Sequence, residues 1–141
     1  MTFKIAFDES LVLDTPGFDE DDLVYLAEVG LESQKRRIAA GVNVNDQPAQ
    51  PLSKSWRKAK LRRGKSGIRD LRFTGALLDN LGVRESDNES ATIGFTDPWQ
   101  ATKAAINQDR EAMFGLSDAD VANVDEAADR LFARKIRRLA A

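Results

Sequence analysis

The fold is decided by the stretch from Asp19 to Gly41, which reads DEDDLVYLAEVGLESQKRRIAAG. Apolar and small residues recur in it at helical spacing, which predicts one long helix that begins at Asp19 and ends at Gly41. The Asp19 carboxylate can cap the first free N–H groups, and Phe18 and Leu23 occupy the two positions of a hydrophobic staple. Acidic residues meet the positive end of the helix dipole and basic residues the negative end, so the charges support the same boundaries.

A second face of this helix is also apolar, because it carries Val24 and Leu31. The helix would be roughly 33 Å long, which is a large fraction of a small domain. We therefore expect a neighbour against the second face, and another subunit is one candidate for that neighbour.

The helical pattern stops after Gly41. Pro48 and Pro51 break helices, and many lysines and arginines follow them. We predict an extended basic loop or arm over residues 42–72, within which Ser53–Arg63 has the alternative of a short basic helix. A loop of this length is unusual inside a compact domain and is often either functional or disordered.

Shorter elements are expected elsewhere in the chain. Residues 14–17 and 86–90 have turn-forming sequences, Thr74 can cap a single helical turn, and residues 98–107 can hold one or two turns. Strand-like alternation of apolar and polar residues appears at 3–7, 81–85 and 91–95. The side chains expected to share one side of the sheet are Leu81, Val83, Ile93 and Phe95.

The last helix has the clearest signals. Ser117 and Asp120 have the spacing of a capping box, and Leu116 and Val121 supply a staple. Its predicted buried stripe consists of Val121, Val124, Ala128, Leu131, Phe132 and Leu139. The elements together predict a single α+β domain over residues 1–141, with the long first helix and the last helix packed on a small antiparallel sheet and a long basic loop beside them.

The composition argues against catalysis. The 141 residues include no histidine and no cysteine, which excludes Ser-His-Asp triads, Cys-His dyads and ordinary zinc sites. The acidic run 19–22 lacks the alternating order of a calcium loop, and helix-start electrostatics explain it. No stretch has the ~20 apolar residues of a membrane span, and residues 1–7 lack the apolar core of a signal peptide. We expect no enzyme activity, no cofactor, no metal and no small-molecule substrate.

The charge is distributed unevenly although the net charge is only −2. Residues 1–32 hold nine acidic side chains and one basic one, whereas residues 54–72 hold nine basic and one acidic. The candidate contact residues of the basic stretch are Lys54, Trp56, Arg57, Lys58, Lys60, Arg62, Arg63, Lys65 and Arg69. The candidate subunit-interface residues of the first helix are Asp19, Glu20, Asp21, Asp22, Val24 and Leu31.

Two interpretations of the basic stretch compete. Its cations can contact the phosphates of a nucleic acid, with Trp56 stacked on a base. Alternatively the stretch is a solvated loop, or it pairs with the acidic region of the same or the next subunit. The mildly acidic chain as a whole favours the second interpretation.

Two fragments, Arg72–Leu77 (RFTGAL) and Met113–Asp120 (MFGLSDAD), suggest a family. With Pro48 and Pro51 before them and the strand pair between them, their order resembles the virion morphogenesis, or tail completion, family of tailed phages. The resemblance covers about residues 19–139. It implies a ring-forming α+β subunit of the tail terminator or head–tail joining type, which acts by symmetric assembly and not by turnover.

The same resemblance implies the partners and the location. It favours a hexameric ring of identical subunits in the tail or neck of the virion, assembled in the host cytoplasm. Neighbouring tail-tube or connector proteins are the implied partners, and DNA passing through the lumen is a possible non-specific contact of the basic loop. A nucleic-acid-binding module that uses residues 54–72 is the alternative function.

Overall fold

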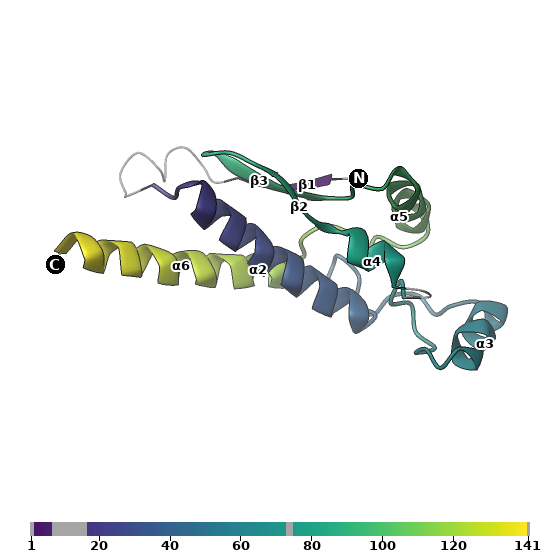
Figure 1. Ribbon diagram of the computed structural model, residues 1–141. Helices are drawn as coiled ribbons and strands as arrows, with labels where there is room; N and C mark the ends of the chain where they lie inside the picture. The colour runs from purple at the N-terminus through teal and green to yellow at the C-terminus, as the bar shows by residue number, and fades with distance from the viewer. Residues whose placement is uncertain (1, 7–16, 73–74, 141) are drawn as a thin grey trace.

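Figure 1 shows a computed structural model of the chain, which describes residues 2–6, 17–72 and 75–140. The elements follow in the order β1 (Thr2–Ala6), α2 (Glu20–Ala39), α3 (Lys54–Arg62), α4 (Ala76–Asn80), β2 (Gly82–Ser86), β3 (Ser90–Gly94), α5 (Pro98–Arg110) and α6 (Asp118–Ala140). The predicted α+β class is confirmed. The turn predicted at 14–17 lies almost entirely outside the described residues, as do Phe7 and the proposed cap Thr74.

The sheet has three antiparallel strands in the order β1-β3-β2. Ile93 in the central strand pairs with Phe3 on one side and with Val83 on the other. The strands confirm the predicted positions, with boundaries that differ by one residue. Burial does not alternate along β3, where every residue except Thr92 is buried. Ile93 and Leu81 are buried in the core, and Val83 and Phe95 pack partly buried against it, so the predicted shared side is also confirmed.

The ends of α2 are the predicted ones. Asp22 N donates to Asp19 Oδ1 at 2.9 Å and Asp19 N donates to Asp22 Oδ2 at 2.9 Å, which makes a reciprocal capping box. Gly41 has a φ of +71°, a left-handed conformation that glycine adopts without strain. It closes the helix by donating from its N–H to the Ile38 carbonyl at 2.9 Å.

Helix α2 lies between the sheet and α6 (Figure 1). Leu23, Ala27 and Leu31 belong to the main core with the sheet, while Leu26 on another face packs against Val124 and Ala127 of α6. Of the predicted second face, Leu31 packs in the main core, so its neighbour lies within the same chain, while Val24 is half-buried. The prediction of Leu31 as a subunit-interface residue was wrong, because this side chain is only 7% exposed and offers no surface to another subunit.

The later helices differ from the predictions in length and burial. Helix α5 is longer than the expected one or two turns, because Asp97 caps it and it continues to Arg110. In α6 the capping box is confirmed, since Ser117 Oγ accepts from Asp120 N at 3.1 Å. Val121 and Leu139 are 42% and 72% exposed, not buried, because among the described elements α6 packs chiefly on α2 and its end extends past the start of α2 (Figure 1).

The region 42–72 is not one extended loop. Its centre is helix α3, with Ser53 as the N-cap and Arg63 as the C-cap. The short-helix alternative for Ser53–Arg63 is thus confirmed, and the loop prediction was wrong over this part. Ser53 Oγ accepts from Trp56 N at 3.4 Å, which is a long hydrogen bond and fits a short helix with little tertiary support.

Candidate functional site, a basic arm and the pocket at its base

Residues 53–65, which we call the basic arm, extend from one end of the molecule (Figure 1). Among the residues of α3, only Lys60 is buried. The other cations of the arm are exposed, namely Lys54, Arg57, Lys58, Arg62, Arg63 and Lys65. The structure therefore places six of the predicted basic residues together on one solvated element.

Lys60 holds the base of the arm. Its ammonium group forms an ion pair with Asp70 Oδ1, and it donates to the Ile68 carbonyl at 2.7 Å. The two paired side chains are 6% and 8% exposed. The charge of Lys60 is balanced inside the chain, so its prediction as a contact for DNA or another subunit is corrected to a structural role.

Arg69 also makes a structural contact at the base of the arm. It is half-buried, and its Nε donates to the Gln50 carbonyl at 3.0 Å. This hydrogen bond joins the chain before the arm to the chain after it. Unlike Lys60, Arg69 has no carboxylate within ion-pair distance among the described residues, so none of them balances its positive charge.

A pocket of about 440 Å³ opens at the base of the basic arm. One wall is a single face of α5, whose residues Gln100, Lys103, Asn107 and Arg110 are spaced three or four apart. The remaining lining consists of Leu52, Ser53, Trp56, Lys60, Arg69, Leu71, Arg72, Gly75 and Leu77. Segments that are far apart in sequence thus build one cavity of the size that small ligands or side chains occupy.

The lining is cationic and partly apolar. It includes five lysines and arginines, three leucines and one tryptophan, and no aspartate or glutamate belongs to the described residues that form it. Since Asp70 balances Lys60, four of these charges remain for a ligand. Gln100 is 8% exposed, and its Oε1 finds no hydrogen-bond donor within the described part of the chain. The pocket therefore suits an anion that also carries an apolar group and an N–H donor.

The predicted acidic surface at the start of α2 is smaller than expected. Asp19, Glu20 and Asp21 are exposed, but Asp22 pairs with Lys135 Nζ at 2.5 Å. Burial alone would raise the pKa of Asp22, yet the hydrogen bond from Lys135 and the capping bonds outweigh it and lower the pKa. Asp22 therefore joins α6 to α2 and contributes little free charge to the surface.

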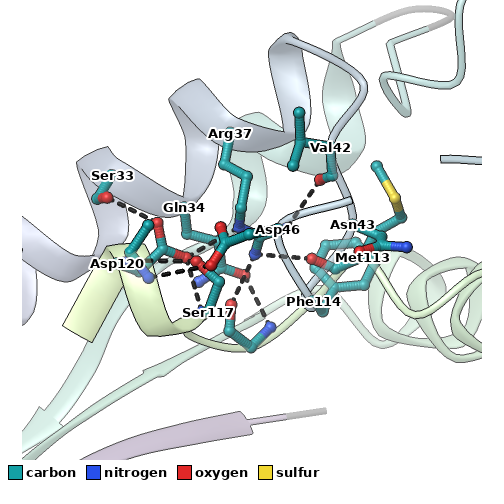
Figure 2. Close-up of polar contacts among 12 residues, drawn as sticks. Ser33, Gln34, Arg37, Val42, Asn43, Asp46, Met113, Phe114, Ser117 and Asp120 are labelled. Atoms are coloured by element: carbon teal, nitrogen blue, oxygen red, sulfur yellow. Dashed lines mark hydrogen bonds and ion pairs between the residues drawn. The ribbon is translucent and has the colours of Figure 1, made fainter. Parts of the chain in front are cut away.

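Sequence reasoning missed the strongest polar cluster, which joins α2 to α6 (Figure 2). Arg37 Nε donates to Asp120 Oδ2 at 2.9 Å, and these side chains are 5% and 2% exposed. The remaining guanidinium nitrogens donate to the carbonyls of Val42, Met113 and Gly115 at 2.8–2.9 Å. The arginine thus fixes the end of α2, the residues after it and the segment before α6.

Asp120 is equally well satisfied. Its Oδ1 accepts from Ser33 Oγ at 2.6 Å, and its Oδ2 also accepts from Ser117 N at 3.0 Å. A group whose hydrogen-bonding capacity is used within the fold has none left for a substrate, so we assign this cluster to structure. A signal was present in the sequence, because Arg37 lies three residues after Gln34 and directly before Ile38, at the helical spacing of the buried side of α2.

Asp46 adds a second carboxylate at the start of α6 (Figure 2). Its Oδ2 accepts from Ala119 N at 3.1 Å. This backbone hydrogen bond, followed by one from Ser117, lowers the pKa of Asp46 below its ordinary value of 3.8. The residue has a φ of 59°, a left-handed conformation that aspartate and asparagine tolerate better than most residues.

Neither a metal centre nor a membrane segment emerges from the described residues. Within 17–72 and 75–140, no three aspartate or glutamate side chains gather closely enough to hold a metal ion. No described helix combines the length and apolar character that crossing a bilayer requires. Comparison with protein-family models, with curated proteins and with solved structures finds no match for this chain.

Proposed function

We propose that this chain is a structural subunit that assembles with copies of itself into a ring, of the kind found at the head–tail joint or tail end of a phage. The observation that carries the proposal is the separation of charge over the surface. The acidic first turn of α2 and the basic arm lie at opposite ends of the molecule (Figure 1). Helix α2 alone, with 20 residues, spans about 30 Å between them.

This separation favours assembly over internal pairing. Two complementary surfaces at opposite ends cannot neutralise each other within one molecule. They can pair between molecules in a head-to-tail contact, which produces a closed ring when the rotation between subunits closes. The order of the two phage-like fragments, RFTGAL and MFGLSDAD, supports the particular setting of a tail or neck ring.

The test is the mass of the protein in solution as concentration rises. We expect multiples of the 15.6 kDa chain mass by light scattering at low salt, alone or with purified tail-tube or connector proteins as neighbours, and rings in negative-stain images. High salt should dissociate them, because exposed charges are screened beyond roughly 10 Å at 0.1 M. A monomer at every concentration, with and without those neighbours, would contradict the proposal.

Binding of nucleic acid by the basic arm is a second candidate. The observation that favours it is the row of exposed cations on α3, together with a Trp56 side chain that is 50% exposed. The affinity for DNA should then fall steeply with salt, and replacing Arg62 and Arg63 by alanine should reduce the log–log salt slope by about 2. Absence of DNA binding at ~50 mM salt, where such contacts are strong, would exclude this function.

A further inference from the structure

We infer that the pocket at the base of the basic arm receives the acidic start of α2 from a second copy of this chain. The inference rests on the proposed function and makes it specific, because it names the receiving site and the inserted segment. The pocket supplies four cations that no described carboxylate balances, an apolar wall and a buried acceptor. The first turn of α2 and its N-cap supply the exposed carboxylates of Asp19, Glu20 and Asp21, together with backbone N–H groups at the helix start.

The charges match on both sides of the contact. Arg72, Lys103 and Arg110 line the pocket, and no described carboxylate there competes with a ligand. Glu20 and Asp21 are exposed in the first turn of α2, and neither caps that helix. Ion pairs that lose water on contact are stronger than those that stay solvated, so a concave cationic site favours acidic side chains that enter it.

Gln100 argues for a ligand that brings an N–H group. A buried amide oxygen without a donor destabilises a fold, because it has lost its hydrogen bonds to water. A ligand that donates an N–H group to the Gln100 amide oxygen would explain why this unpaired oxygen lies at the pocket wall. A peptide segment has such donors in its backbone, whereas inorganic phosphate at neutral pH has mainly acceptor oxygens.

The segment must come from another molecule. In Figure 1 the pocket elements α3 and α5 lie at the end of the molecule opposite to the start of α2. One copy therefore offers its pocket to the next copy and its acidic segment to the previous one. Such a contact uses two different surfaces, which is the geometry that a ring requires.

The direct test is titration of the full-length protein with a synthetic peptide of sequence GFDEDDLV. Trp56 lines the pocket, and in a Trp99→Phe background it is the only tryptophan, so its fluorescence reports binding. We expect saturable binding that weakens with salt. The matched peptide GFNQNNLV, which has the same shape without charge, should bind at least roughly tenfold more weakly, as expected for loss of charge-assisted contacts.

Variants of the pocket separate this site from the rest of the basic surface. Lys103→Ala with Arg110→Ala should weaken the peptide by roughly tenfold or more, whereas Arg134→Ala on α6 should leave binding unchanged. Gln100→Met should weaken the peptide while raising the melting temperature, because it removes the buried unpaired oxygen. A residue with only a structural role would not produce that opposite pair of effects.

The possible outcomes are distinguishable. Failure of the peptide to bind, equal binding of the neutral peptide, or saturation of the pocket by oligothymidylate in place of the peptide would each overturn the inference. If the wild-type protein assembles and the Lys103→Ala/Arg110→Ala variant assembles equally well, the pocket inference fails and the ring proposal stands. If the peptide binds and copies associate through this contact but form no closed ring, the ring proposal fails and the pocket inference stands.

Discussion

The pairs Arg37–Asp120 and Lys60–Asp70 are both buried ion pairs, but their surroundings differ. The first lies between α2 and α6 and is surrounded by carbonyls, hydroxyls and backbone N–H groups (Figure 2). The second lies at the base of a solvated helix and carries few further contacts. We infer that Arg37–Asp120 stabilises the fold as a whole, whereas Lys60–Asp70 attaches the basic arm to a fold that is stable without it.

The largest effect on the free energy of unfolding is expected when the Arg37–Asp120 pair is broken. Asp120→Ala leaves the Arg37 guanidinium buried without its counter-charge, which should cost about 3–5 kcal/mol of unfolding free energy. That is a large share of the ~5–15 kcal/mol that stabilises a typical domain. Urea unfolding measures it, with Asp125→Ala on the exposed face of α6 as the control, expected within about 0.5 kcal/mol of wild type. A similar cost in both variants would mean that the buried network has no special importance.

The second pair should give a smaller and local effect. Lys60→Met leaves Asp70 without its partner, but the arm can open and expose that carboxylate to water. We expect less than about 1 kcal/mol of global destabilisation. Amide hydrogen exchange should show faster exchange in α3 with unchanged exchange in α2, and the exposed Lys58→Met is the control. A global loss comparable to that of Asp120→Ala would erase the distinction between the two pairs.

The smallest effect concerns Asp46 beside the first pair. Its pKa is lower in the folded protein, because the bonds from Ala119 and Ser117 favour the charged form. The resulting stabilisation is fully present above the unfolded pKa and is lost as pH falls through the lower folded pKa. Asp46→Asn keeps a residue suited to the left-handed backbone, so it should be less stable than wild type at pH 7 and should converge with it once the pH falls below the lowered pKa of Asp46. Urea unfolding across pH tests this, and a difference that is constant with pH would contradict it.

The parts of the fold that follow from local sequence were predictable. The capping boxes at Asp19 and Ser117, the stop at Gly41 and the positions of the strands each depend on residues within a few positions of one another. The short helix over 53–63, an alternative to the extended loop, is predictable for the same reason. These features needed no knowledge of which segments meet in space.

Features made by distant segments were not predictable. Arg37 and Asp120 are 83 residues apart, and the pocket joins residues from Leu52 to Arg110. The pattern identified two apolar faces on α2 but could not decide which neighbour covers each, so Leu31 was placed wrongly. The sequence alone likewise suggested that Lys60 is a free cation. Only the fold shows that it forms an ion pair with Asp70.

The central claim, that the acidic and basic ends of neighbouring copies pair, is tested most directly by a charge exchange. One variant carries Glu20→Lys and Asp21→Lys, and the other carries Arg62→Glu and Lys65→Glu. Each variant alone loses much of the charge contrast between its two ends, so it should remain monomeric at concentrations where the wild type assembles, whereas an equimolar mixture should assemble. Light scattering after size exclusion measures this at low salt. Assembly of either variant alone at wild-type concentrations, or a mixture that stays monomeric while the wild type assembles, would contradict the account.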